Sequence, residues 1–207
     1  GNNRAILAGD ILFARASLLV ASLGPEIVAH HARTFERLCE GQLNETFGPT
    51  SGTDRVDFYL QVLADKTGSL VSTAASFGAL LSGAGQLVAD VVSEFGEKVG
   101  VAFQIADDVL DLASSGEQSG KTPGTDLREG VDTLPVLLLR RREAAGMIDE
   151  AGAQILRDLT GDLSSDEALA SVVERLRAHD VLEETRELAR TWARDAVAAL
   201  SALPKGE

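Results

Sequence analysis

The chain has 207 residues, 44% of them hydrophobic and 25% charged, which is the balance of an ordinary globular domain with a sizeable core. A formal net charge of −13 leaves no surplus of cations to neutralise nucleic-acid phosphates, so nucleic acid is excluded as the main partner. No apolar run reaches the ~18 residues of a membrane span, and the single cysteine, Cys39, predicts a reducing, cytoplasmic compartment without internal disulfides.

Helical apolar periodicity recurs almost throughout the chain, and no alternating strand pattern appears. The sequence therefore predicts one all-α domain over residues 1–207. We expect helices over residues 4–22, 26–46, 55–82, 86–113, 133–145, 148–160, 165–178 and 180–202. The helix 86–113 is apolar around much of its circumference, which predicts a central position, and 180–202 has one charged face typical of a surface helix. The intervening segment 114–132 is rich in Gly and Ser and is expected to be a loop.

Three aspartates stand within five residues of the otherwise apolar stretch FQIADDVLDL. At about 100° per residue, the side chains of Gln104, Asp107, Asp108 and Asp111 share one arc of about 100° on the predicted helix. Apolar side chains fill the opposite side. The pattern predicts a helix with an apolar back and a front of three carboxylates and one amide.

Such a front has two explanations. Like charges four residues apart destabilise a helix, and a divalent cation would relieve the repulsion. Oxygen ligands without His or Cys favour Mg²⁺, which is usually bound by one or two carboxylates together with substrate phosphates. The alternative is an acidic helix face that is simply solvated, and the helix alone does not decide between the two.

A phosphate ligand would also need cations from the protein, and two lysines are candidates. Lys66, followed by Thr67, interrupts a long apolar helix, and Lys121 follows the carboxylate helix in the loop SGKTPGTD. In the same loop, Asp126 is either a further metal ligand or a turn-capping residue. Each lysine taken singly is more often a solvated surface charge.

Taken together and in order, these motifs resemble the trans-polyprenyl diphosphate synthases, the family that includes farnesyl and geranylgeranyl diphosphate synthases. The resemblance extends along the whole chain and corresponds to the C-terminal two-thirds of that family. It is carried by the segments LAGDILFARA, LCEGQLNE, ADKTGSLVSTAASFGALLSGA and FQIADDVLDLASSGEQSGKTPGTDLREGVDTLP.

The resemblance implies an all-helical bundle of the isoprenoid synthase type around a central cavity. It implies a homodimer that condenses an allylic prenyl diphosphate with isopentenyl diphosphate to give a longer polyprenyl diphosphate. By resemblance, Asp107, Asp108 and Asp111 form the second aspartate-rich motif and hold Mg²⁺, the first of them above all. Contacts to the allylic diphosphate are implied for Lys66, Thr67, Gln104 and Lys121, with Lys66, Gln104 and Lys121 acting in catalysis.

Two departures from the family stand out. The family's N-terminal helices, with the first aspartate-rich motif, are missing from these 207 residues, so we expect the chain alone to be inactive. In REGVDTLP, Val131 stands where the family usually has a lysine, which removes one cation from the diphosphate site. Product length and the identity of the primer are not readable from this part of the family's sequence.

Both departures keep a second reading open, in which the chain is a non-catalytic partner subunit of a heteromeric synthase. A third reading is a terpene synthase that uses the same metal site for cyclisation. Aromatic residues make up only 4% of the chain. Because terpene cyclases typically line their cavity with aromatic side chains that stabilise cations, the composition favours chain extension.

Overall fold

The computed structural model describes residues 2–113 and 123–203, and every regular element in these two stretches is helical. The prediction of an all-α fold is therefore confirmed. The elements are α1 (Asn2–Ala21), α2 (Pro25–Phe47), α3 (Arg55–Leu63), a π-helical turn (Ala64–Gly68), α4 (Ser69–Leu81), α5 (Gln86–Ala113), α7 (Thr125–Arg128), α8 (Leu134–Ala144), α9 (Glu150–Leu159), α10 (Asp166–Ala178), α11 (Asp180–Ala199) and a 3₁₀ turn (Leu200–Ala202).

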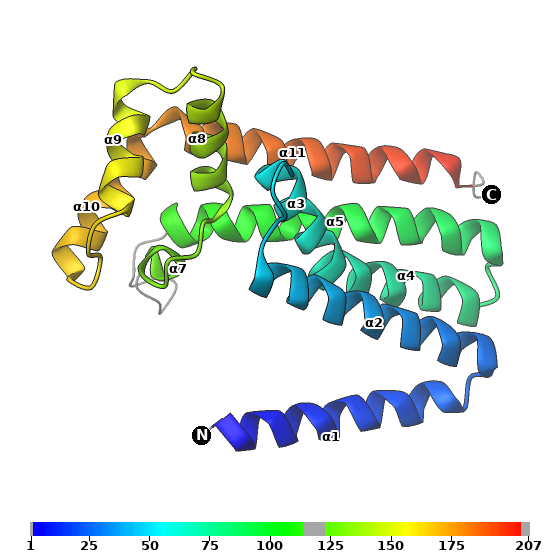
Figure 1. The fold of residues 1–207 in the computed structure, drawn as a ribbon. Coiled ribbons are helices and arrows are strands. Elements are labelled where there is room, and N and C mark those ends of the chain that lie inside the picture. Colours follow the sequence, from blue (N-terminus) through cyan, green and yellow to red (C-terminus); the bar gives the residue numbers. More distant parts are fainter. Residues whose placement is uncertain (1, 114–122, 204–207) are drawn as a thin grey trace.

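The long helix α5 runs through the middle of the molecule, with α4 along one side and α11 along another (Figure 1). Its apolar back is buried: Val101, Ile105 and Leu112 are at most 1% exposed. These side chains join one hydrophobic core with residues from α3 and from α8 to α11. On the polar front, Asp108 is buried as well, whereas Asp107 is exposed, and both lie beside the C-terminal end of α2 and the start of α8.

Local capping explains where most helices begin. The carboxylate of Asp54 accepts hydrogen bonds from the backbone N–H groups of Val56 and Asp57 in the first turn of α3, and Asp149 and Ser165 each accept one N–H in the first turn of α9 and α10. Proline stands in the first turns of α2 and α8, where a missing N–H costs nothing. These signals are readable in the sequence, which is why the predicted boundaries agree closely with the observed ones.

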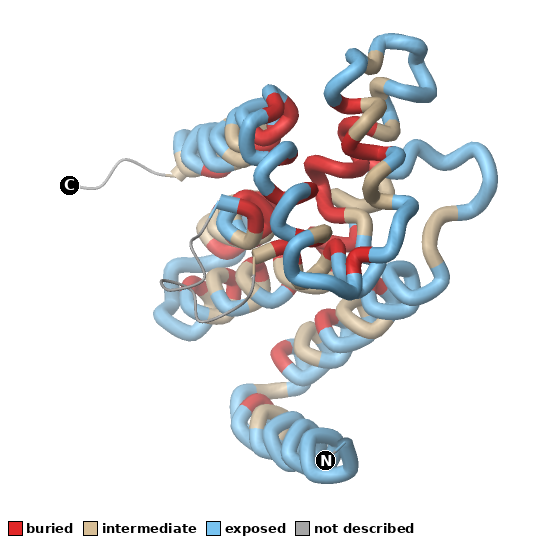
Figure 2. The backbone as a smooth tube through the Cα atoms, turned by 90° about the vertical axis from the view of Figure 1, so that its left-hand side faces the viewer, coloured by how far each residue is buried: buried red, intermediate tan, exposed pale blue. Residues whose placement is uncertain are grey.

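Helices α1 and α2 form an antiparallel hairpin at the edge of the bundle, and α1 is almost entirely exposed (Figures 1 and 2). Val20 is the only buried residue of α1. Helix α1 nonetheless carries seven exposed large apolar residues: Ile6, Leu7, Ile11, Leu12, Phe13, Leu18 and Leu19. Phe13 packs against Phe35 and His31 of α2. The other six side chains make up the exposed apolar face of α1, and exposed apolar surface of this kind is typical of an interaction site.

The predicted helix 55–82 differs from the structure in one respect. A π-helical turn, Ala64–Gly68, separates α3 from α4. Such turns insert an extra residue into a helix and occur frequently at functional sites. The turn lies directly against α5: a Cβ added at Gly100 would be 2.6 Å from the Cα of Gly68. Two glycines thus let the two backbones approach more closely than side chains would permit.

This close approach predicts a specific loss of stability. Replacing Gly100 with Ala is expected to lower the free energy of unfolding by about 1–3 kcal/mol, because the added methyl group overpacks backbone that has no room to move. Urea unfolding followed by circular dichroism measures the change.

Gly78→Ala in α4 is the matched control. A Cβ at Gly78 meets nothing within 4 Å, so this change is expected to stabilise the chain by about 0.5–1 kcal/mol through helix propensity. Equal stability of the two alanine variants would contradict the packing argument.

Candidate active site

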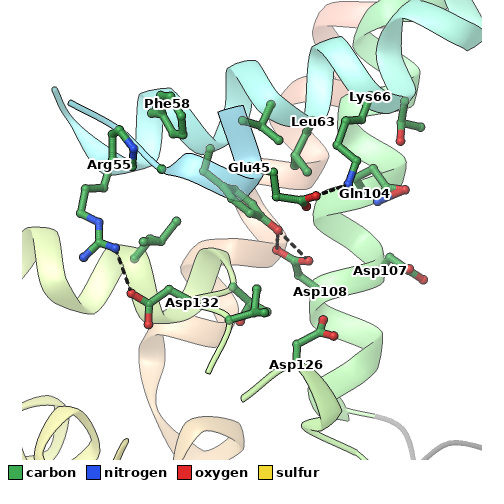
Figure 3. Close-up of a pocket in the computed structure, with 18 of the residues that line it drawn as sticks. Glu45, Arg55, Phe58, Leu63, Lys66, Gln104, Asp107, Asp108, Asp126 and Asp132 are labelled. Atoms are coloured by element: carbon green, nitrogen blue, oxygen red, sulfur yellow. Dashed lines mark hydrogen bonds and ion pairs between the residues drawn. The ribbon is translucent and has the colours of Figure 1, made fainter. Parts of the chain in front are cut away.

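A cavity of about 600 Å³ lies where the ends of α2, α3 and α5 meet the segment that joins α7 to α8. The polar front of α5 forms one wall, and the π-helical turn forms the next (Figure 3). Five residues predicted as functional line this one cavity: Lys66, Thr67, Gln104, Asp107 and Asp108. Of the other two, Asp111 is not among its lining residues, and Lys121 lies outside the described residues.

Asp108 is the most buried carboxylate of the cavity. Its oxygens accept hydrogen bonds from the Tyr59 hydroxyl at 2.9 and 3.1 Å and from the backbone N–H of Leu134 at 3.1 Å. Burial raises the pKa of Asp108 to about 6, and the negative charges of Asp126 and Asp107 raise it as well, whereas the two donors lower it. Asp108 therefore acts as a fixed acceptor that joins α3, α5 and the start of α8.

Asp107 is exposed and points to a different side of α5 from Asp108 (Figure 3). Asp126, on the short helix α7, lies across the cavity and faces Asp108. The charges of Asp107 and Asp126 both act on Asp108, so each of them lies within electrostatic reach of that carboxylate. Sequence reasoning left the role of Asp126 open, and the structure places it in the cavity wall.

The side chain of Asp111 accepts a hydrogen bond at 3.1 Å from the backbone N–H of Gly124, a residue in the left-handed region with φ of 75°. Asp111 thereby ties the end of α5 to the start of α7. The three aspartates of the motif consequently do not converge on one point. Across residues 2–113 and 123–203, no group of three or more His, Cys, Asp or Glu side chains is close enough to hold a metal ion.

The donor set still fits a hard divalent cation. Mg²⁺ requires only one or two carboxylates, with waters and ligand phosphates completing its shell. Asp107, which is exposed, and Asp126 both line the cavity. Thr133 adds a hydroxyl in the same wall, 2% exposed and without a hydrogen-bond partner among the described residues. An all-oxygen set of this kind suits Mg²⁺ or Ca²⁺ rather than zinc.

The cationic side of the cavity contains a pair that sequence reasoning missed. The Lys66 ammonium lies 2.5 Å from the carboxylate of Glu45, which comes from the last turns of α2. Gln104 lies beside Lys66 (Figure 3). The other cation in the described wall, Arg55, is 3.4 Å from Asp132. The separation of 21 residues between Lys66 and Glu45 explains why spacing along one helix did not reveal the pair.

A second unpredicted network lies beneath Lys66. Asp65 in the π-helical turn is 7% exposed and accepts hydrogen bonds from Arg37 Nε at 2.7 Å and Gln61 Nε2 at 2.9 Å. Arg37 also donates to Glu97 on α5 at 2.6 Å. The guanidinium thus bridges α2, the turn and α5 with charge-assisted hydrogen bonds. This network fixes the backbone from which Lys66 and Thr67 extend into the cavity.

Val131 also lines the cavity, and its side chain is 46% exposed. Val131, which stands where the resembled family usually has a lysine, therefore belongs to the site and adds an apolar side chain to it. Phe58, Val62, Leu63 and Leu137 add further apolar wall. The cavity thus combines a carboxylate end with an apolar side, an arrangement able to hold a charged head and an alkyl tail.

The comparisons with known proteins agree with this arrangement. The family model described as polyprenyl synthetase matches residues 1–176. The chain belongs to the polyprenyl synthetase family. It is 42% identical over 204 residues to the nonaprenyl diphosphate synthase of Mycobacterium tuberculosis, and 32% identical over 209 residues to the decaprenyl-diphosphate synthase of Dictyostelium discoideum.

Among solved structures, the geranylgeranyl pyrophosphate synthase of Corynebacterium glutamicum, complexed with calcium and isoprenyl diphosphate, is similar to this family member with a TM-score of 0.85. The two are 41% identical, and the match covers 99% of this chain and 62% of that one. The chain spans 59% of the mycobacterial relative and 43% of the Dictyostelium relative. No helix within the described part of this family member is long and apolar enough to cross a bilayer.

The Tyr59–Asp108 contact yields a testable prediction. Tyr59→Phe removes the hydroxyl donor and leaves the buried carboxylate with one fewer partner. We expect the free energy of unfolding to fall by about 1–2 kcal/mol, since a hydrogen bond to a charged group is stronger than a neutral one. Urea unfolding measures the loss.

The same substitution in an Asp108→Asn background isolates the pair. There the lost bond is neutral, and the cost of removing the hydroxyl is expected to fall to roughly half. If Tyr59→Phe costs the same in both backgrounds, the hydroxyl does not stabilise the protein through the Asp108 charge.

Proposed function

We propose that the chain is the C-terminal part of a polyprenyl diphosphate synthase, a Mg²⁺-dependent prenyltransferase that condenses an allylic prenyl diphosphate with isopentenyl diphosphate. The observation that carries the proposal is the single cavity in which Lys66, Gln104 and the carboxylates of α5 stand beside an apolar wall. An allylic diphosphate has matching parts: an anionic head and an alkyl tail. The named relatives are synthases of long prenyl diphosphates.

The reaction requires the carbon–oxygen bond of the allylic substrate to break, so that the diphosphate leaves with the electron pair. The resulting allylic cation is attacked by the double bond of isopentenyl diphosphate, and a proton is then lost to give the longer product. No protein nucleophile is needed, because catalysis consists of stabilising the leaving group and shielding the cation. Lys66 and the Gln104 amide donate hydrogen bonds to the leaving oxygens in this proposal, with Thr67 and Lys121 as further diphosphate contacts.

When bound, Mg²⁺ supplies charge neutralisation of the diphosphate. Asp107 is the best placed of the three predicted ligands, because its carboxylate is exposed at the cavity, and Asp126 is the second ligand we assign. Asp108 and Asp111 support the site. Asp108 joins α3, α5 and α8, and Asp111 connects the end of α5 to the start of α7 through the N–H of Gly124. The apolar wall around Phe58 and Leu63 keeps water from the cation and accommodates the tail.

The proposal extends to the assembly. A homodimer is expected from the family resemblance, and the exposed apolar face of α1 is the surface we assign to it. The single free cysteine, Cys39, accords with a cytoplasmic protein. We also propose that the chain is inactive by itself, because one aspartate-rich motif supplies only half of the expected metal ligands.

One observation favours a second candidate. Val131 lines the cavity where the family usually has a lysine, which suits a partner subunit that supports a heteromeric synthase without catalysing the reaction. The two candidates differ in one measurable respect, because only a catalytic chain needs to bind diphosphate together with Mg²⁺.

Calorimetric titration with inorganic diphosphate, in the presence and absence of Mg²⁺, tests the assignment. Asp107→Asn is expected to lower the affinity for diphosphate at saturating Mg²⁺ by about tenfold or more, since it removes a direct metal ligand. Without Mg²⁺ the same variant is expected to bind diphosphate no more weakly than the wild type.

Asp195→Asn, an exposed position on α11, is the charge-matched control and is expected to change neither affinity. Wild-type chain that binds no diphosphate with Mg²⁺ would contradict the proposed function and favour the partner-subunit reading. An unchanged affinity in Asp107→Asn would contradict the assignment of Asp107 alone.

The proposed dimer surface has its own test. Leu12→Glu places a charge in the middle of the exposed face of α1, where Leu12 is 71% exposed. We expect sedimentation velocity at micromolar concentration to show a dimer for the wild type and a monomer for the variant, because burying an unpaired carboxylate is costly.

Val197→Glu is the matched control, as Val197 is 65% exposed on α11, away from the α1–α2 hairpin. This variant is expected to remain dimeric. Dimers in Leu12→Glu would show that the face of α1 is not the interface.

A further inference from the structure

The Lys66–Glu45 pair has a consequence for how an anion enters the cavity. Glu45 Oε2 lies 2.5 Å from Lys66 Nζ, and the same oxygen accepts a hydrogen bond from Gln42 Nε2 at 2.8 Å. Gln42 and Glu45 both belong to α2, so the carboxylate is held in place from its own helix. The side chains of Lys66 and Glu45 are 30% and 42% exposed and both line the cavity, so a ligand there can reach both.

The charges of the cavity wall explain why the Lys66–Glu45 pair matters for anion binding. Of the described lining residues, two are cationic, Lys66 and Arg55, and each already faces a carboxylate. Five are acidic: Glu45, Asp107, Asp108, Asp126 and Asp132. When all are ionised, the lining carries three more negative than positive side chains, and Arg140, which donates to Asp132 at 2.8 and 3.1 Å, offsets one of them from outside the lining. A free diphosphate, itself a polyanion, therefore meets repulsion and finds no unoccupied cation in this wall.

We propose that Glu45 is a specificity-determining residue: by occupying Lys66, it makes diphosphate binding conditional on a divalent cation. This inference rests on the proposed function and adds to it a residue outside the aspartate-rich motif. A diphosphate without metal has to break the Lys66–Glu45 pair and then lie beside the released carboxylate. A diphosphate that carries divalent cations brings positive charge to the carboxylate wall, and its phosphate oxygens replace Glu45 at Lys66.

Two roles of Glu45, orienting Lys66 and competing with the ligand, predict opposite effects on diphosphate binding when its charge is removed. If Glu45 only orients Lys66 toward the ligand, its carboxylate helps diphosphate binding, and removing its charge weakens binding. If Glu45 competes with the ligand, removing its charge strengthens binding when no metal is present. The sign of a single measurement therefore distinguishes the two.

Glu45→Gln is the appropriate variant, since it removes the charge while keeping the length of the side chain and an amide oxygen that accepts from Gln42. Calorimetry or ³¹P NMR titration with inorganic diphosphate in EDTA is expected to show up to about fivefold tighter binding than the wild type, the range of a partly exposed ion pair. At saturating Mg²⁺ the gain is expected to be smaller, so the ratio of affinities with and without Mg²⁺ falls.

Two controls separate this effect from a general change in charge. Glu40→Gln, an exposed position on the same helix and not among the lining residues of the cavity, changes the net charge equally and is expected to leave the ratio unchanged. In a Lys66→Ala background, the gain from Glu45→Gln is expected to shrink, because the part that acts through the released ammonium is lost.

Weaker or unchanged metal-free binding in Glu45→Gln would overturn the inference and leave the proposed function intact, provided that the wild type binds diphosphate with Mg²⁺. A gain of equal size in the Lys66→Ala background would also overturn it, because Glu45 would then act without Lys66. Absence of binding in wild type and variant alike, with or without Mg²⁺, would overturn the proposed function and this inference together.

Discussion

Asp108 joins three parts of the chain that lie far apart in sequence. Its carboxylate, buried at the end of α5, accepts hydrogen bonds from Tyr59 on α3 and from the first backbone N–H of α8. A buried ionised carboxylate is costly unless it is hydrogen-bonded, so these partners have to be present together. Their presence fixes three walls of the cavity at once. This constraint also sets the position of Asp107, because the adjacent residue, Asp108, is held inside the molecule by its hydrogen bonds.

The electrostatic character of the cavity follows from the same arrangement. A helix front that carries Asp107 and Asp108 and faces Asp126 accumulates negative charge. The protein relieves part of it with hydrogen-bond donors and with Lys66 and Arg55, but each of these two cations is already paired. The remaining negative charge favours the binding of cations, and it disfavours the binding of phosphates that carry no cation. Under the proposed function, the metal would therefore form part of the surface that binds a diphosphate.

Sequence periodicity predicted the long helices, because it depends on contacts within one helix, but the short helix α7 lies in the segment 114–132 that was expected to be a loop. Sequence reasoning also singled out Lys66 and Gln104 as candidates, and both line the cavity. It did not reveal the contacts of Tyr59 with Asp108, of Glu45 with Lys66 and of Asp65 with Arg37, which join residues 21 to 49 positions apart. The π-helical turn was missed for a related reason: Gly68 is required by the backbone of α5, and not by any local pattern.

Lys66 shows how two such long-range contacts act on one side chain. The Arg37–Asp65 pair fixes the π-helical turn, so charge-assisted hydrogen bonds set the backbone position of Lys66. Glu45 holds the Lys66 ammonium itself. Asp65 is buried, so losing its partner is costly, whereas the Glu45 side chain is 42% exposed and its ion pair is weak enough for a ligand to replace. Under the proposed function, the backbone of Lys66 would stay in position while its ammonium exchanges Glu45 for a diphosphate.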